Sequence, residues 1–235
     1  MTNQRPMVLV SGIAEGLGAS IASAFAAAGH DVIGLARTPR IKDGVACAVR
    51  KRGGEYVHLV CDLTVPGQVT EALAPYANHI SVFVHNAHRL LIKAADATTP
   101  QEFEEVWRTT CWGAMTAASV LLPPMIARGA GTVILSGATA SVRGGTNFAA
   151  FASAKFALRG FAQSLARECG PKGIHIAHVM LDGLIEEPQT IARFGAAESG
   201  RLDPDVIAKV YVDLAGQHPS AWTHELDLRP AGERF

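Results

Sequence analysis

The stretch MVLVSGIAEGLG, residues 7–18, joins a short apolar run to three closely spaced glycines. The run 7–11 predicts a buried strand, and the Ala-rich segment 16–28 predicts a helix. Small residues at such a junction let the backbone approach a phosphate group, while the first turn of the helix offers free N–H groups. The stretch therefore favours a strand–turn–helix unit that binds a dinucleotide, with an ordinary turn as the alternative.

The same alternation continues along the chain. Apolar runs predict further strands at 31–36, 56–60, 80–84, 131–136, 174–180 and 223–228. Helices are expected near 40–52, 67–75, 101–127, 147–169 and 203–215, with an irregular part before the last of them. Apolar strands that alternate with helices are typical of a parallel sheet covered on both faces. We therefore expect a doubly wound, Rossmann-like α/β fold with about seven strands, as a single domain over residues 1–235.

Composition and charge give no sign of a nucleic-acid or membrane partner. Lys+Arg and Asp+Glu are both 21, so the formal net charge is zero. The start MTNQRPMVLV is too polar for a signal peptide, and no apolar run reaches the length of a membrane span. The cysteines are scattered without paired spacing, which indicates reduced thiols in a cytoplasmic protein; they are Cys47, Cys61, Cys111 and Cys169.

The glycines follow the spacing Gly-x-x-x-Gly-x-Gly, which resembles the motif of the short-chain dehydrogenase/reductase family. CDLT (61–64) and GTVILSGATAS (131–141) resemble segments of the same family. HNAH (85–88) matches the family's Asn-Asn-Ala-Gly at Asn86 and Ala87 only, and FASAK (151–155) falls where the family has Tyr-x-x-x-Lys. The resemblance covers nearly the whole chain and implies a bound nicotinamide dinucleotide. The residues that it assigns to the cofactor are Gly12, Ile13, Gly16, Leu17, Gly18, Asp62, Leu63, Asn86 and Lys155.

The resemblance also implies that the usual catalytic centre is largely replaced. In the family, a tyrosine is the general acid/base, and a lysine four residues later holds the nicotinamide ribose and lowers the tyrosine pKa. Lys155 matches that lysine, but Phe151 stands at the tyrosine position. The family serine falls on Ala138, and the asparagine of the long helix falls on Thr110. We therefore expect that the groups that handle the substrate oxygen are missing.

His88 is a candidate for a substitute acid. It stands where the family has a glycine beside the nicotinamide, and an ordinary histidine pKa of about 6.5 suits proton transfer at neutral pH. A loop histidine without a role is the alternative. His85 lies close by, but no further ligand has the spacing of a metal site. Other residues expected to rim the pocket are Ser136, Thr139, Ser141, Arg143 and Asp182.

The second strand indicates which nicotinamide is preferred. Ala36 stands where relatives that use NAD have an aspartate, and Arg37 follows, with a fork geometry that suits a 2′-phosphate. Glu15 opposes this argument if it pairs with Arg37. We therefore expect NADP(H) to be favoured over NAD(H).

Two functions remain open at this point. One is an oxidoreductase with displaced acid/base chemistry, and the other is a non-catalytic subunit that senses the cofactor or another ligand. The apolar segments GAMTAASVLL and FALRGFAQSLA on the two longest predicted helices favour a homodimer or homotetramer, since these helices form the dimer surface in the family.

Overall fold

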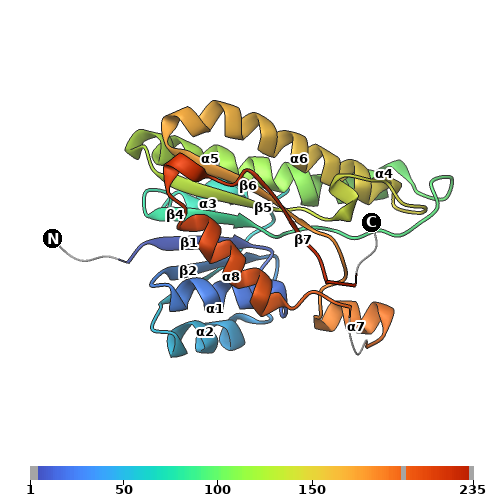
Figure 1. Cartoon of the computed structure of the whole chain (residues 1–235), viewed down its shortest axis with the longest axis horizontal. Coiled ribbons are helices and arrows are strands. Elements are labelled where there is room, and N and C mark those ends of the chain that lie inside the picture. The colour runs from blue at the N-terminus through green and yellow to red at the C-terminus, as the bar shows by residue number, and fades with distance from the viewer. Residues whose placement is uncertain (1–4, 197–199, 233–235) are drawn as a thin grey trace.

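One seven-stranded parallel sheet forms the centre of the protein, in the order β3-β2-β1-β4-β5-β6-β7 (Figure 1). The computed structural model describes residues 5–196 and 200–232, so the polar start MTNQ lies outside the described residues. The strands are β1 (Met7–Ser11), β2 (Asp31–Ala36), β3 (Tyr56–Val60), β4 (Ile80–His85), β5 (Gly131–Ser136), β6 (Ile174–Leu181) and β7 (Glu225–Leu228). The predicted doubly wound, Rossmann-like fold is confirmed.

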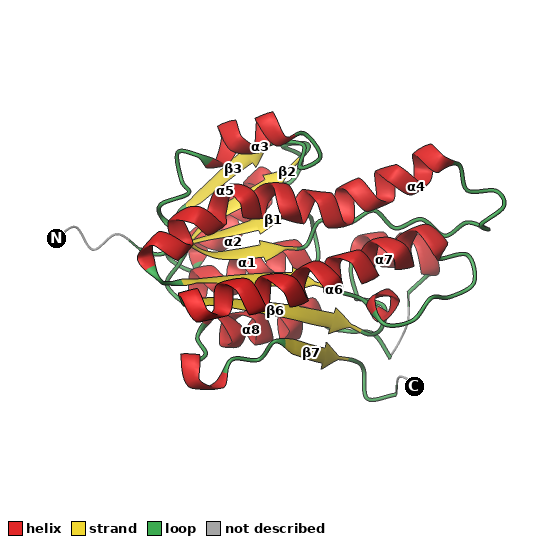
Figure 2. Ribbon diagram, turned by 90° about the horizontal axis from the view of Figure 1, so that it is seen from above, coloured by secondary structure: helices red, strands yellow, loops and turns green. Residues whose placement is uncertain are grey.

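Helices cover both faces of the sheet. One face packs against α1 (Leu17–Ala27), α2 (Lys42–Lys51) and α8 (Pro204–Ala215), and the other against α3 (Pro66–Leu73), α5 (Gly113–Arg128) and α6 (Ala149–Cys169). Fully buried side chains fill each interface, with Phe25 and Tyr211 on the first face and Phe83 and Leu121 on the second. Figure 2 shows the strands running in a common direction, so their carboxyl ends share one edge of the sheet.

The long predicted helix contains a break that the sequence did not indicate. It begins as α4 (Pro100–Trp107), passes through a π-helical segment, η1 (Arg108–Trp112), and continues as α5. By length and composition alone, the helical stretch Pro100–Arg128 is apolar enough to cross a membrane, whereas the sequence showed no apolar run of that length. Half of its most apolar window (50%) is buried inside the protein, and a core helix has the same character.

The segment after β6 is more regular than expected. It holds α7 (Pro188–Phe194), a helix of 7 residues that is too short to produce a clear hydrophobic period. A bridge between Ile185 and Leu202 ties the ends of this segment together. Residues 197–199 of the same segment lie outside the described residues. Helix α7 therefore lies beyond the carboxyl ends of the strands, where ligands bind in sheets of this kind.

Candidate functional site

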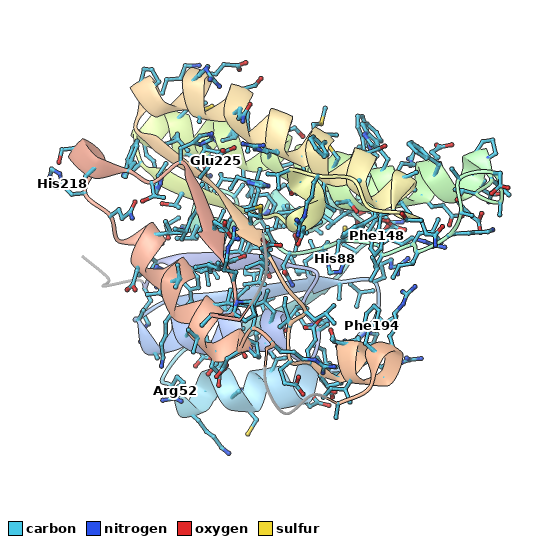
Figure 3. All side chains as sticks on the ribbon, turned by 45° about the vertical axis from the view of Figure 1, so that its right-hand side comes forward. Arg52, His88, Phe148, Phe194, His218 and Glu225 are labelled. Carbon is cyan, nitrogen blue, oxygen red and sulfur yellow. The ribbon has the colours of Figure 1, made fainter. Side chains whose placement is uncertain are left out.

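Two neighbouring cavities open at the carboxyl edge of the sheet. One has a volume of about 620 Å³ and the other of about 550 Å³. Both are lined by Asn86, His88, Glu187 and Gln189, so these residues form the wall between them. Figure 3 shows His88 and Phe148 on one side of this region and Phe194, on α7, on the other (Figure 3).

The smaller cavity brings together most of the residues predicted to bind a cofactor. Its lining includes Gly12, Ile13, Gly18, Arg37, Asp62, Leu63 and Asn86. Gly16 and Leu17 form the start of α1 beside it. Gly12 has a φ of +73°, and a Cβ there would lie 2.5 Å from the Cα of Ala87. A glycine is therefore required where the β1–α1 turn passes the β4 loop.

Hydrogen bonds hold Asp62 in place in the lining of this cavity, whereas Arg37 in the same lining is exposed. The Asp62 carboxylate accepts hydrogen bonds from the backbone N–H and the hydroxyl of Thr64, at 2.9 and 2.8 Å. Arg37 is exposed, and no ion pair within 4.0 Å joins it to Glu15 among the described contacts. The pairing with Glu15 that would weaken the attraction of Arg37 for a phosphate is therefore absent from the described contacts.

The larger cavity has Lys155 and Phe151 in its wall. Lys155 is 3% exposed, and its Nζ donates a hydrogen bond to the carbonyl oxygen of Ser136 at 2.7 Å. The ammonium also lies 5.6 Å from the centre of the Phe151 ring. Burial lowers the pKa of Lys155 to about 7, because a buried ammonium loses its hydration.

Apolar groups surround Phe151 on α6. Its ring is 7% exposed and contacts the rings of His88 and Phe148, with centroids 6.0 and 6.4 Å away. Ala138 packs against the same cluster and also lines the cavity. The Ala138 N–H donates to the hydroxyl of Ser141 at 3.1 Å. The predicted positions Ala138, Phe151 and Lys155 therefore lie around one cavity.

Thr110 occupies a different place from the other predicted catalytic positions. It is fully buried in the π-helical segment η1 and is not in the lining of either cavity. His85 Nε2 donates to the carbonyl oxygen of Thr110 at 3.0 Å, and His85 Nδ1 accepts from the hydroxyl of Ser11 at 2.9 Å. Burial lowers the pKa of His85 to about 3, so the ring is neutral. His85 therefore ties β4 to β1 and to η1.

His88 is poorly suited to act as an acid at neutral pH. Its side chain is exposed to the open cavity, and its Nδ1 donates to the carbonyl oxygen of Asn86 at 3.3 Å. The surrounding walls restrict solvent, and the nearby Lys155 ammonium adds a positive charge, so the pKa of His88 is lowered from its ordinary value. The ring is therefore mostly neutral near pH 7 and lacks the imidazolium proton that an acid would donate.

Two of the residues expected at the rim have structural roles instead. Ser141 is fully buried behind Ala138. Asp182 is 5% exposed, accepts a hydrogen bond from the hydroxyl of Thr139 and lies 3.4 Å from Arg229 Nη2. Neither is in the lining of the larger cavity, whereas Ser136, Thr139 and Arg143 are. Among the described residues, no group of three His, Cys, Asp or Glu side chains could hold a metal ion.

No site residue in α7 or in the turn before it was predicted from the sequence. Glu187, Gln189, Thr190, Arg193 and Phe194 line the larger cavity. Glu187 Oε2 accepts a hydrogen bond from the backbone N–H of Leu17 at 3.2 Å, across 170 residues of sequence. Burial raises the pKa of the Glu187 carboxyl group. The pair Glu186–Glu187 before Pro188 was the available signal, but nothing local indicated what it would contact.

The comparison with known proteins agrees with this geometry. The sequence profile described as short chain dehydrogenase matches residues 6–189. The chain belongs to the short-chain dehydrogenase family. A short-chain dehydrogenase from Rhodopseudomonas palustris has a similar structure, with a TM-score of 0.81 and 35% identity over 95% of this chain and 98% of that one.

Two characterised relatives are also similar to this chain in sequence. The short-chain reductase protein NovJ of Streptomyces niveus is 31% identical over 79% of this chain and 71% of its own length. A fatty acyl-CoA reductase of Acinetobacter baylyi is 28% identical over 74% of this chain. The match spans only 61% of that reductase.

Proposed function

We propose that this short-chain dehydrogenase binds NADP(H) and has low or no carbonyl-reductase activity, because its Ser/Tyr catalytic centre is degraded. The observation that carries the proposal is the apolar ring of Phe151 beside Lys155 in the wall of the larger cavity. In this reading, Phe151, Ala138 and Thr110 stand at the positions of the catalytic tyrosine, serine and asparagine. None of the three supplies a phenol, a serine hydroxyl or a side-chain amide.

The missing groups are expected to slow hydride transfer to a carbonyl strongly. A positioned acid typically contributes about 10²–10⁴ in rate, and a donor to the developing oxyanion about 10²–10³. Thr139 lines the cavity, but its hydroxyl already donates to Asp182. His88 is the acid that the sequence analysis put forward as a substitute, and its lowered pKa leaves it neutral near pH 7.

Binding of the dinucleotide does not depend on the missing groups. The glycine turn, Asp62 and Asn86 line the smaller cavity, and Lys155 has two further N–H groups available for ribose hydroxyls. A bound nicotinamide would supply a hydride to a ligand in the larger cavity. Arg37, without an acidic residue at Ala36, favours NADP(H) over NAD(H).

A non-catalytic role in sensing a cofactor or ligand is the second candidate. The cavity of about 620 Å³ supports it, because a pocket of ligand size is present although no strong acid faces it. In either role we propose a cytoplasmic homodimer or homotetramer; all four cysteines are free thiols, and only Cys47 is exposed.

Two measurements on the purified protein decide between the candidates. The first is NADPH binding by fluorescence, and the second is NADPH oxidation with a panel of aldehydes and ketones. Binding with little turnover supports the proposal. Brisk turnover would show that displaced acid/base chemistry operates, and His88→Ala would then identify or exclude its acid. Absence of binding would remove the cofactor from both candidates.

A further inference from the structure

The carboxylate of Glu187 occupies the amino end of α1. It accepts a hydrogen bond from the N–H of Leu17, the first residue of that helix. A Cβ on Gly16 would lie 2.4 Å from Glu187 Oε2, so the carboxylate also packs directly against the glycine turn. The amino end of a helix attracts anions through its free N–H groups and its positive dipole. The Glu187 carboxylate therefore occupies the helix end that would otherwise attract a phosphate.

Glu187 and a dinucleotide would compete for this place. The wall between the two cavities contains Glu187, and a molecule that spans both must pass this wall. A pyrophosphate bridge brought against the carboxylate would meet like charge in a partly desolvated place, where repulsion is stronger than in water. The Leu17 N–H already donates its hydrogen bond to Glu187, so it is not free to bind a phosphate.

The Glu187 side chain is held by fewer hydrogen bonds than the backbone around it. The backbone around Glu187 is held in place, because Glu186 N–H donates to the carbonyl oxygen of Leu202 at 2.9 Å and Leu202 N–H donates to that of Leu184 at 2.9 Å. The Glu186 carboxylate is engaged elsewhere, 2.7 Å from Arg201 Nη1. Glu187 has only the single hydrogen bond to Leu17 N–H among those described for its side chain.

We propose that Glu187 is a specificity-determining residue that weakens the binding of pyrophosphate-containing dinucleotides until its side chain leaves the amino end of α1. This inference rests on the proposed dinucleotide site and adds the residue that sets its affinity. It predicts that the free protein binds NADPH more weakly than its glycine turn alone would allow. The same carboxylate leaves phosphate-free ligands of the smaller cavity unaffected.

The test compares NADPH affinity in the protein and three variants by fluorescence titration. Glu187→Thr and Glu187→Gln remove the charge, and Glu186→Gln is the matched control, since it alters the neighbouring carboxylate that faces Arg201. We expect both Glu187 variants to bind NADPH roughly two- to fivefold more tightly, the factor that corresponds to the usual contribution of one charge at a helix end. Glu186→Gln should bind as the parent does. Adenosine, which has no phosphate, should bind all four proteins alike.

Three other outcomes would overturn the role of Glu187. Equal NADPH affinity in the parent and both Glu187 variants would overturn the role of Glu187 and leave the proposed cofactor site standing. A gain of similar size for adenosine would also overturn it, because the effect would not depend on phosphate. If neither the parent nor the variants bind NADPH while thermal unfolding shows them folded, both the site and the role of Glu187 are wrong.

Discussion

The ammonium of Lys155 lies over the ring of Phe151, 5.6 Å from its centre. The four-residue step along α6 brings the two side chains together, and burial leaves the ammonium with the Ser136 carbonyl oxygen at 2.7 Å as its described hydrogen-bond acceptor. The aromatic face offers a further weak attraction to the charge. A phenyl ring, however, has no proton for the lysine to influence. Under the proposed function, this arrangement would hold a ribose but would lack an acid beside it.

Restoring the two oxygen-handling groups should create activity. We expect Phe151→Tyr with Ala138→Ser to raise NADPH-dependent reduction of small carbonyls by about 10² or more over the parent, and either change alone to do less. Lys155 is already placed to lower the pKa of the new phenol. Phe148→Tyr is the matched control, because Phe148 lines the same cavity without facing Lys155 in a described contact. Tight NADPH binding without turnover in the double variant would show that the cavity does not hold a carbonyl within hydride distance.

The buried ammonium of Lys155 should make stability depend on pH. Its pKa is lowered to about 7 in the folded protein, so above that value the unfolded chain binds the proton more tightly. The free energy of unfolding should therefore rise by about 1–2 kcal/mol between about pH 7 and about pH 8.5. Lys155→Met should flatten this rise in urea titrations, whereas the exposed Lys172→Met should keep it. An unchanged slope in Lys155→Met would assign the pH dependence to other groups.

Thermal shifts should report the choice of cofactor. At about 100 times its dissociation constant, a ligand adds about 2.7 kcal/mol to stability, and NADP(H) should give a larger shift than NAD(H) at equal concentration. Arg37→Ala should abolish the difference. Arg40→Ala is the control, because Arg40 lines the same cavity. A larger shift with NAD(H) in the parent would reverse the argument from Arg37.

The helices α4, α5 and α6 should form an interface between copies of the chain. Large apolar side chains are exposed on them, including Phe103 (38%), Met115 (40%) and Phe156 (44%). Light scattering at micromolar concentration should show at least a dimer, and Phe156→Glu should shift it toward the monomer. Val206→Glu, at an apolar residue of α8 that is 55% exposed on the other face of the sheet, should not. A clean monomer of the parent would exclude this interface.

The sequence by itself determined the fold and the main elements of the site. Alternating apolar runs and helices specify a parallel sheet, because each buried strand needs cover on both faces. The bounds of β1, β2, β3 and β5 agree with the predicted runs, since these strands end at polar residues or at turns. The spacing of the glycines put forward Gly12 and Gly18, and the resemblance of FASAK to the family motif put forward Lys155; all three line the cavities, while their roles toward a cofactor stay predictions.

Tertiary structure decided what each side chain contacts. His85 is 25 residues from Thr110 in sequence, and Glu187 is 170 residues from Leu17, so no local pattern contains these contacts. Asp182 was expected at the rim, but the packing of β6 against β7 places Arg229 beside it. Short elements such as α7 lack a period long enough to read. Periodicity records which face of an element is buried, whereas the partner at that face depends on how the whole chain folds around the sheet.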